Sequence, residues 1–537
     1  MQTKYIVVLG SLLSGLGKGV VTASISKILD FYDCRSMPMK FDGYLNYDCG
    51  TMNPFRHGEV FVLDDKSEVD MDFGTYERFV GADMDGSLSI TGGKLFSELI
   101  KKERKGDFLG RDVQFIPHLT DLIISKIRDA SERLKLDFLI IEVGGTVGDI
   151  ENSYFIEAMR QLSLAEKTVF VNLTYVPRLS SVGEQKTKPT QIANRNLMQL
   201  GIRTDIMVCR AETKLSSEVK QKIALFSNIS QDMIIEDPEI DNVYSMPLEF
   251  MEQGMDKAIF GKLEIKAPKL NRLKVEAWAN ATKGMRRHKN KVRIAIVGKY
   301  TNLKDSYASV SAAVEHSANW HKINPEIVWI ESDLIKDDDS AKSALGNISG
   351  MIIPGGFGKR GTEGMIKAIE YARTNGIPCL GICLGMQLMA IEYARNVCGI
   401  KDADSSEFNR RAANKIIDLM ENQRSLEEKG GNMRLGSWPM SIRENTLAME
   451  AYGSDKAAER HRHRYEFNNA FRTEMEKHGF VFSGISPDGE LVEIIEWPNG
   501  KGIGTQSHPE FKSRPERPSP LFNVLIKRAS DYLKFSA

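Results

Sequence analysis

The sequence predicts an α/β protein with two doubly wound, mostly parallel sheets, each in its own domain. The chain has 537 residues, and single hydrophobic cores stop growing at about 250 to 300 residues. Short apolar runs alternate with longer amphipathic stretches, which is typical of parallel strands covered by helices. Hydrophobic residues make up 42% and charged residues 27% of the chain, a balance typical of globular proteins.

In the first half, apolar runs mark the strands, and the stretches between them carry helical patterns. The expected strands cover residues 5–9, 137–143, 168–174 and 205–210. Residues 267–291 are basic and helix-prone and contain no strand run. We therefore expect a first domain of residues 1–266, followed by an interdomain linker of residues 267–291.

The second half repeats the strand-then-glycine pattern of an α/β domain. A new strand opens at Val292, and similar patterns occur at 350–361 and 377–387. Residues 409–431 are highly charged and end in glycines, which indicates an exposed helix and loop. Residues 292–537 are expected to form the second domain.

Charge and cysteine content exclude several classes of protein. Lys plus Arg (72) equals Asp plus Glu (72), so no overall field attracts nucleic acid or an anionic membrane. The six cysteines form no C-x-x-C pair, which argues against a disulfide framework. The N-terminal apolar run is short and lacks a cleavage pattern, and no stretch approaches the roughly 18 apolar residues of a membrane span. We expect a cytoplasmic protein with neither nucleic-acid nor membrane partners.

A glycine-rich loop follows the first strand. Residues 10–19 read GSLLSGLGKG and lead into a helical pattern. Glycines let backbone N–H groups converge on phosphate oxygens, the helix N-terminus adds positive potential, and Lys18 can neutralise β and γ oxygens. Gly19 stands where the standard motif has a Ser or Thr that binds magnesium. We therefore expect two carboxylates elsewhere, Asp72 and Glu142, to hold the metal.

Lysines further along the first half predict a second polyphosphate site. Lys186 and Lys188 are two residues apart, so in an extended chain both side chains point the same way. Lys40 and Lys222 are candidates for additional charge in the same cleft. Taken singly, each of these lysines is more typical of a solvated surface residue than of a ligand contact.

A reactive thiol is predicted in the second half. Cys383 lies between an apolar strand and a helical pattern, with glycine two residues away on both sides. This is the spacing of a nucleophile elbow, and the following helix N-terminus favours the thiolate. His508 and Glu510 are the candidate base and orienting acid. His461 and His463 compete as the base, but His508 is preferred because an acid follows two residues later.

An oxyanion hole is also expected beside this thiol. Gly355 and Gly356 follow another strand and could offer backbone N–H groups beside the N–H of Leu384. Such donors stabilise the charge that develops on a carbonyl oxygen under attack. The second half therefore predicts covalent thiol chemistry.

Longer motifs resemble known families. Cys383 within GICLGMQ, with HPE at 508–510, resembles the triad glutamine amidotransferases, and PGGFGKRG with ERHRHRYEFNN narrows the resemblance to the CTP synthase family. The first half is similar to that family in SGLGKG, GTMNPFRHGEVFVLDD, GTYERF, KERKGDFLG, EVGGTVGDIE and KTKPTQ, in the family's order. The resemblance covers essentially the whole chain.

The resemblance implies a coupled reaction. Cys383 would attack the amide of glutamine, His508 would act as base and acid, and Glu510 would orient it. The ammonia released would pass internally to a second site, where ATP phosphorylates O4 of the uracil ring of UTP and ammonia displaces the phosphate to give CTP. The family also implies Mg²⁺ with ATP, no organic prosthetic group, GTP as activator, CTP as inhibitor, and a homotetramer that could assemble into filaments.

The resemblance further assigns ligand contacts to the two domains. ATP would be held by Gly15, Leu16, Gly17, Lys18, Gly19, Val20, Lys40, Asp72, Arg210 and Ile240, and Mg²⁺ by Asp72 and Glu142. UTP or CTP would be held by Ser14, Asp149, Ile150, Glu151, Lys186, Lys188, Gln191 and Lys222. Glutamine would be held by Gly356, Leu384, Gly385, Met386, Gln387, Glu407 and Arg464.

The chain departs from the family pattern at two positions. Gly15 replaces a serine that is common in the loop, where backbone amides do the binding. Ala308 stands where some members carry a lysine near the activator region, so the details of GTP activation stay open.

Two alternative functions remain at this point. One is another amidoligase of the same architecture, acting on a carboxylate of a cobalamin or biotin precursor; the lysines of KTKPTQ argue against it, since a triphosphate explains them. The other is a catalytically silent assembly or regulatory protein. The presence of Cys383, His508, Glu510, Lys18 and Asp72 argues against that second alternative.

Overall fold

The structure is a computed structural model that describes residues 2–179, 181, 183–301, 303–419 and 433–536. The chain forms two compact units. Unit 1 comprises Met1–Cys49 and Thr75–Lys283, and unit 2 comprises Gly50–Gly74 and Gly284–Ala537. Residues 50–74 therefore pack with the second half of the chain. The expected domain boundaries at residues 266 and 291 stay a prediction.

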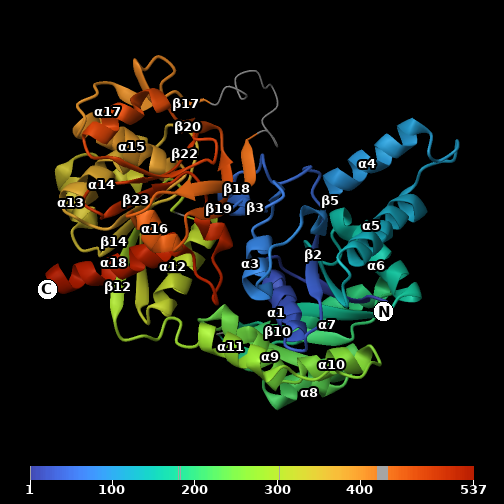
Figure 1. The fold of residues 1–537 in the computed structure, drawn as a ribbon. Coiled ribbons are helices and arrows are strands. Elements are labelled where there is room, and N and C mark those ends of the chain that lie inside the picture. Colours follow the sequence, from blue (N-terminus) through green and yellow to red (C-terminus); the bar gives the residue numbers. More distant parts are fainter. Residues whose placement is uncertain (1, 180, 182, 302, 420–432, 537) are drawn as a thin grey trace. The chain divides into compact units, whose positions relative to one another are not determined.

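Unit 1 is built on a seven-stranded parallel sheet with the order β11-β10-β7-β1-β6-β2-β5 (Figure 1). Its strands are β1 (Lys4–Gly10), β2 (Ser36–Asp42), β5 (Ser89–Thr91), β6 (Phe138–Val143), β7 (Thr168–Tyr175), β10 (Ile206–Ala211) and β11 (Ile234–Pro238). The four strands expected from apolar runs in this half are confirmed as β1, β6, β7 and β10. Because the strands are parallel, their carboxyl ends meet at one edge, where open α/β sheets bind ligands.

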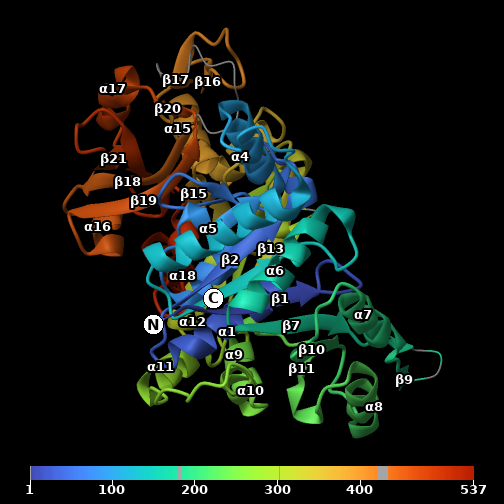
Figure 2. The ribbon, with the colours of Figure 1, turned by 90° about the vertical axis from the view of Figure 1, so that its right-hand side faces the viewer.

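Helices cover both faces of this sheet (Figure 2). On one face, Ile6 and Val8 join a core formed with α1 (Lys18–Asp30), α9 (Met246–Glu252) and α10 (Met255–Lys262). On the other face, the ring of Phe41 stacks on that of Phe155 in α6 (Ser153–Ala165), with centroids 4.8 Å apart. Burial of both faces explains why these strands are continuous apolar runs in the sequence.

The other helices of this part are α3 (Asp72–Val80), α4 (Gly92–Lys105), α5 (Thr120–Arg133), α7 (Lys188–Gln199), α8 (Ser217–Ser227) and α11 (Arg272–Thr282). A short hairpin pairs β8 (Arg178–Leu179) with β9 (Glu184–Gln185).

The helix expected within residues 267–291 is confirmed as α11, which packs on unit 1. Trp278 is fully buried, and its indole N–H donates a hydrogen bond to the carbonyl of Tyr244 over 2.9 Å. Lys274 forms an ion pair with Asp30 at the end of α1, with an N···O distance of 2.7 Å. The helix is therefore anchored to unit 1 by an apolar and an ionic contact.

Unit 2 contains a nine-stranded sheet with the order β13-β12-β14-β15-β23-β22-β21-β18-β19. Its strands are β12 (Lys291–Gly298), β13 (Asn324–Glu331), β14 (Gly350–Ile353), β15 (Cys379–Ile382), β18 (Arg434–Ile442), β19 (Lys456–His463), β21 (Val481–Ile485), β22 (Val492–Glu496) and β23 (Gly502–Thr505). The first five strands in the sheet order pair in parallel, and the others are antiparallel because β21, β22 and β23 follow one another through short turns. The two sheets confirm the predicted α/β class.

Helices also cover both faces of the second sheet. On one face, Ile294 and Ile296 pack against α12 (Ala308–Trp320) and α18 (Pro520–Ser536). On the other, Ala295 and Val297 pack against α13 (Asp338–Leu345), α14 (Thr362–Thr374) and α15 (Leu384–Asn396). Two short helices, α16 (Leu447–Tyr452) and α17 (Arg472–Lys477), complete the unit.

The prediction of a helix within residues 409–431 is wrong for the part of this stretch that the structure describes. Residues Asn414–Leu419 form β17, which pairs with β16 (Ala403–Ser405) and β20 (Tyr465–Phe467). Ile416 and Ile417 are both fully buried, and the pairing with a strand about fifty residues away overrides the helical propensity of the charged neighbours. Residues 420–432 lie outside the described residues.

Residues 50–74 form α2 (Pro54–His57) and a small hairpin of β3 (Phe61–Val62) and β4 (Glu68–Val69) within unit 2. Arg462 of β19 forms an ion pair with Glu68, with an Nε···Oε1 distance of 2.8 Å. The ring of Phe61 packs on that of Phe511, with centroids 4.8 Å apart. An apolar contact and a buried ion pair thus hold this stretch on the second sheet.

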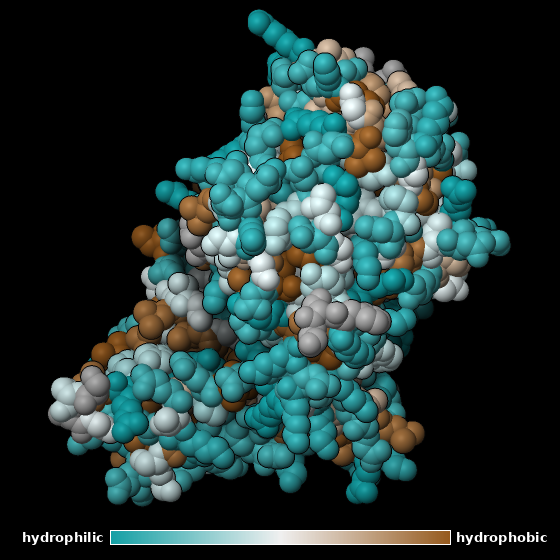
Figure 3. Space-filling view, turned by 90° about the vertical axis from the view of Figure 1, so that its left-hand side faces the viewer, coloured by the Kyte–Doolittle hydropathy of each residue, from teal (hydrophilic) through white to brown (hydrophobic). Residues whose placement is uncertain are grey.

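A membrane span requires a helix of sufficient length and hydropathy. No described helix is both long and apolar enough to cross a bilayer. On the face drawn in Figure 3, hydrophilic residues predominate and hydrophobic ones occur in small groups.

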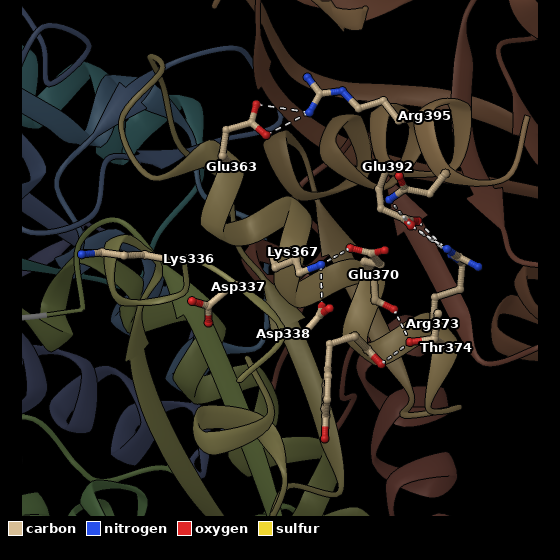
Figure 4. Close-up of polar contacts among 12 residues, drawn as sticks. Lys336, Asp337, Asp338, Glu363, Lys367, Glu370, Arg373, Thr374, Glu392 and Arg395 are labelled. Carbon is tan, nitrogen blue, oxygen red and sulfur yellow. Dashed lines mark hydrogen bonds and ion pairs between the residues drawn. The ribbon is translucent and has the colours of Figure 1, made fainter. Parts of the chain in front are cut away.

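Ion pairs connect α13, α14 and α15 on one face of unit 2 (Figure 4). Arg373 of α14 makes a bidentate contact with Glu392 of α15, with a shortest N···O distance of 2.7 Å, and the Glu392 side chain is fully buried. Lys367 contacts the exposed Asp338 and also Glu370, at 2.5 Å and 2.8 Å. Of these pairs, the one formed by Arg373 has the greater effect on stability, because its carboxylate has no access to water.

We expect Arg373→Met to lower the free energy of unfolding by about 3 kcal/mol, because it leaves the Glu392 carboxylate buried without its cation. The double variant Arg373→Met, Glu392→Met should regain most of that loss. The exposed-pair control Lys367→Met should cost less than about 1 kcal/mol. Urea unfolding of the full chain measures all three, and an equal loss in Lys367→Met and Arg373→Met would contradict the assignment.

Candidate functional site

The glycine-rich loop joins β1 to α1 at the carboxyl edge of the first sheet. Gly17 is the N-cap of α1 and has a φ of 98°, a left-handed conformation that glycine adopts without steric cost. Lys18 is buried, and its ammonium donates a hydrogen bond to the carbonyl of Gly145 over 2.7 Å. A Cβ at Gly10 would lie 2.7 Å from the Lys18 side chain, so the lysine crosses directly over the loop. Gly15, Leu16, Gly19 and Val20 lie in the same loop and first helical turn.

Other predicted nucleotide-site residues lie at the same edge of the sheet. Lys40 and Glu142 are opposite each other on β2 and β6, and both are buried. The hydroxyl of Tyr76 donates to Oε2 of Glu142. Arg210, at the end of β10, contacts Asp237 of β11 over 3.0 Å. Ile240 follows β11 and is half-buried.

The two predicted metal ligands belong to different units. Glu142 is part of unit 1, and Asp72, which begins α3, is part of unit 2. Mg²⁺ needs only one or two protein carboxylates when phosphate oxygens and water complete its shell. Glu142, a carboxylate at the carboxyl end of β6, fits that requirement in kind and position. Among the described residues, no cluster of three or more His, Cys, Asp or Glu is arranged for a metal ion.

Four of the predicted UTP contacts line one open pocket of about 890 Å³ in unit 1. Lys186 follows β9, Lys188 and Gln191 begin α7, and Lys222 lies on α8. Lys186 forms an ion pair with Glu184 over 2.6 Å. Arg178 and Lys214 line the same pocket and add positive charge.

The remaining UTP or CTP candidates lie elsewhere in unit 1. Ser14 is exposed in the glycine-rich loop. Asp149 accepts hydrogen bonds from the backbone N–H and hydroxyl of Thr146, over 2.9 and 2.7 Å. Ile150 is 85% exposed, and Glu151 is also exposed. These residues are not among the described residues that line the lysine-rich pocket.

In unit 2, Cys383 occupies a strained turn between β15 and α15. Its φ of 52° and ψ of −103° are unfavourable for any residue with a side chain. A Cβ at Gly385 would lie 2.1 Å from the carbonyl oxygen of Ile353, and one at Gly381 would lie 2.7 Å from the backbone of Gly385. Only glycine fits at these two positions, as the elbow pattern predicts.

His508 and Glu510 meet Cys383 at this turn. Nδ1 of His508 lies 2.7 Å from Oε1 of Glu510, and the opposite side of the ring interacts with the Cys383 sulfur. Burial opposes the charged imidazolium, but the negative charges of Glu510 and Cys383 outweigh burial and raise the pKa of His508 to about 10. The site therefore favours the charged, imidazolium form of His508.

The two competing histidines, His461 and His463, are less suited than His508 to act as the base. Nδ1 of His461 lies 3.0 Å from Nε2 of His463, and both rings are buried. Burial, together with the charge of Arg434, lowers the pKa of both histidines well below 6.5. The contacts of the three histidines support His508 as the base. The catalytic role of His508 stays a prediction.

The thiol opens into a small cavity of about 70 Å³. Gly355 and Gly356, the predicted oxyanion-hole residues, line it beside Cys383 and His508. A further part of its wall consists of Pro54, Glu59 and Val60 from the stretch 50–74.

Of the predicted glutamine contacts, Gly356 lines this cavity, and the other six are not among its described lining residues. Leu384, Gly385, Met386 and Gln387 form the buried first turn of α15. Oε1 of Glu407 accepts a hydrogen bond from the backbone N–H of Gly358 over 2.6 Å. Arg464 lies close enough to Glu407 to lower its pKa, although burial, the larger effect, raises it.

Two features of this site, Lys299 and the position of residues 50–74, are not predicted by the sequence patterns. The Lys299 ammonium donates to the carbonyls of Phe357, over 3.1 Å, and Gly358. Burial lowers the pKa of Lys299 to about 8. A lysine directly after an apolar strand was the available signal for Lys299, whereas no local pattern indicates that residues 50–74 pack beside the thiol.

Comparisons with known proteins show which families this chain resembles. A family model described as CTP synthase N-terminus matches residues 4–265, and one described as Glutamine amidotransferase class-I matches residues 302–528. A protein from Hydrogenobaculum named CTP synthase is 48% identical over 539 residues, which cover 99% of each chain. One of the same name from Aquifex aeolicus is 45% identical over 537 residues, again 99% of each chain. A solved structure, the glutaminase domain of Trypanosoma brucei CTPS with bound acivicin, is 36% identical, covers 45% of this chain and 94% of that chain, and has a TM-score of 0.42.

The strained thiol, its His508–Glu510 pair and the match over residues 302–528 define a class I glutamine amidotransferase joined to a second α/β unit. The match over residues 4–265 and the relatives that align over 99% of the chain narrow this class to one family. The chain belongs to the CTP synthase family.

We expect Glu510→Gln to remove the main charge that keeps His508 protonated, so that burial lowers the pKa of His508 from about 10. Because the pKa of His508 is raised in the folded chain, its protonation stabilises the fold. This stabilisation is complete below about pH 6.5, the pKa of histidine in the unfolded chain, and it is lost as the pH rises through about 10. The loss of unfolding free energy in Glu510→Gln should therefore be largest near pH 6 and shrink towards pH 10. Urea unfolding across that range measures it, and a pH-independent difference would contradict the pairing.

Proposed function

We propose that the chain is a CTP synthase that aminates C4 of the uracil ring of UTP, using ATP and ammonia taken from glutamine. The observation that carries the proposal is the cavity beside Cys383. His508 and Glu510 are aligned there for amide hydrolysis, and residues of the stretch 50–74, which belongs to the part matched as CTP synthase N-terminus, form a wall. The products are CTP, ADP, phosphate and glutamate.

At the thiol site, the proton of Cys383 passes to His508 and the sulfur attacks the amide carbon of glutamine. The oxygen of the tetrahedral intermediate lies among backbone N–H donors of the 355–356 turn and the start of α15. His508 then protonates the departing ammonia, and water hydrolyses the thioester to glutamate. Glu510 keeps the imidazole oriented and charged throughout.

At the nucleotide site, the γ-phosphoryl group of ATP passes to O4 of UTP, because a conjugated amide oxygen is a poor leaving group until it is phosphorylated. Ammonia then attacks C4 and phosphate departs. Lys18, Lys40 and Arg210 lie at the carboxyl edge of the sheet and can neutralise phosphate charge. Mg²⁺, held by Asp72 and Glu142, would supply further charge on the phosphates when bound.

Pro54 and Val60 are residues of the N-terminal half of the chain that pack within unit 2. Both residues line the thiol cavity, yet they come from the half of the chain that the nucleotide-site family model matches. We propose that ammonia passes internally to the nucleotide site rather than into solvent, as the family's coupled reaction requires.

Further expectations complete the proposal. GTP would activate, CTP would inhibit, and the chain would form a homotetramer able to assemble into filaments. We propose a cytoplasmic location, since nucleoside triphosphates are the substrates and all six cysteines are free thiols.

We expect Cys383→Ala to abolish CTP formation from glutamine while CTP formation from ammonium continues, because only the thiol site needs the cysteine. The control Cys398→Ala, which alters a half-buried thiol outside the cavity, should keep both activities. The ultraviolet absorbance of CTP measures them with ATP and Mg²⁺ present. A wild type that makes no CTP from either donor would favour the catalytically silent alternative.

We expect Lys188→Gln and Lys222→Gln each to raise the KM for UTP about tenfold, the effect of removing one charge-assisted hydrogen bond. The KM for ATP should stay within about twofold of wild type, because these lysines line the second pocket. Lys257→Gln, an exposed lysine of α10, is the matched control and should change neither constant. Equal rises in the two KM values would place the lysines in a shared or indirect role.

A further inference from the structure

The side chain of Gln506 lies against the nucleophile. Its Nε2 is 3.7 Å from the sulfur of Cys383, within the range of an N–H···S hydrogen bond, and the residue is fully buried. A buried amide is costly unless its polar atoms are paired. The position of Gln506 is therefore defined by its partners, of which one is the reactive sulfur.

The second partner of Gln506 determines which end of the amide faces the sulfur. Nε2 of Gln387 donates to the carbonyl of Tyr465 over 3.1 Å, and a carbonyl can only accept. The same Nε2 lies 3.2 Å from the terminal oxygen of Gln506. Because a donor must meet an acceptor there, the oxygen of Gln506 faces Gln387 and its nitrogen faces Cys383.

The sulfur has a different partner for its own proton. The Cys383 thiol donates to the carbonyl of Arg462 over 3.8 Å. A carbonyl near the sulfur favours the neutral thiol, whereas an N–H donor favours the thiolate. The amide of Gln506 and the ring of His508 are therefore side-chain donors that contact the sulfur.

We propose that Gln506 is a further catalytic residue of the thiol site, whose amide N–H stabilises the Cys383 thiolate, and that Gln387 positions it. The inference rests on the proposed glutaminase function and deepens it. Gln506 transfers no proton: the thiol proton goes to His508, the sulfur–carbon bond forms, and the carbon–nitrogen bond breaks. The hydrogen bond from Gln506 weakens as the sulfur loses its charge and is restored when the thioester is hydrolysed.

This role extends the interpretation of Gln387, which the family resemblance assigns to glutamine binding. Both N–H groups of its side chain are engaged, one by Tyr465 and one by Gln506. The side chain therefore acts on the nucleophile through Gln506, in addition to any contact that its oxygen makes.

Other titratable groups near the sulfur do not replace this donor. The cavity is lined by Glu59, Tyr300, Tyr307, Arg462, His508 and Glu510. The Arg462 guanidinium is engaged by Glu68 and by the carbonyl of Gly50. Behind Gln506, its backbone N–H donates to the carbonyl of Glu493, whose carboxylate pairs with Arg434 over 2.6 Å. Gln506 is thus a neutral donor among charged groups that already have partners.

The test is the pH dependence of carbamidomethylation of Cys383 by iodoacetamide, followed by mass spectrometry of the Cys383 peptide in the full chain. Gln506→Met removes the donor and keeps the volume, so the pH of half-maximal rate should rise. Below both midpoints the rate should fall about tenfold. Gln506→Glu keeps the shape and the contact with Gln387 but places a carboxylate near the sulfur, so its midpoint should rise further. Gln387→Met should give a smaller rise, because it releases the orientation of Gln506.

Controls separate this role from packing. Gln253→Met removes a half-buried amide from unit 1 and should leave the Cys383 profile unchanged. Thermal unfolding shows which variants fold, and Gln506→Glu, which keeps the size and shape of the side chain, decides the question if Gln506→Met does not fold. A wild-type midpoint in a folded Gln506→Met, or a midpoint in Gln506→Glu at or below that of wild type, would overturn the proposal.

Glutamate release by the wild type distinguishes a failure of the proposed function from a failure of the role of Gln506. If the wild type hydrolyses no glutamine, the proposed function fails, while the alkylation profiles still report on the Gln506 contact. If the wild type hydrolyses glutamine and the variants keep its alkylation profile, only the role of Gln506 fails. In the supporting case, Gln506→Met lowers kcat for glutamine about tenfold with little change in KM, since the lost contact is to the nucleophile and not to the substrate.

Discussion

The chemistry of unit 2 depends on one backbone constraint, the left-handed conformation of Cys383 between β15 and α15. A non-glycine residue in such a conformation costs about 1 to 3 kcal/mol and persists only where its surroundings determine it. Here the N–H of Cys383 donates to the carbonyl of Thr505 on β23 over 2.7 Å. Gly385 packs directly on the backbone of Ile353 at the end of β14. Three parallel strands therefore fix the place from which the sulfur projects.

The polar groups around this turn are ordered because they are buried. In a low-dielectric interior an unpaired donor or charge is costly, so each group adopts the orientation that satisfies its neighbours. Glu510 orients His508, Gln387 orients Gln506, and the Lys299 ammonium holds the turn after Gly356 by its carbonyls. Such pairing prepares the site before a substrate arrives, which reduces the reorganisation needed during the reaction.

In unit 1, the topology of the sheet brings the polar groups of the site together. A parallel sheet places the carboxyl ends of all its strands at one edge. Lys18, Lys40, Glu142 and Arg210 are far apart in the sequence, yet all lie at the edge formed by β1, β2, β6 and β10. The separate lysine-rich pocket beside α7 and α8 gives the unit a second region suited to phosphate groups.

The sequence by itself determined the features that depend on short-range patterns. Apolar runs located β1, β6, β7, β10 and β12, and the glycines at 381 and 385 predicted the elbow. The family resemblance rested on motifs of the same local kind. The acid two residues after His508 already favoured it over His461 as the base. Only the tertiary structure decided that residues 414–419 form a strand and that residues from 50–74 line the thiol cavity. These depend on pairings between distant parts of the chain, where burial and strand partners outweigh local propensity.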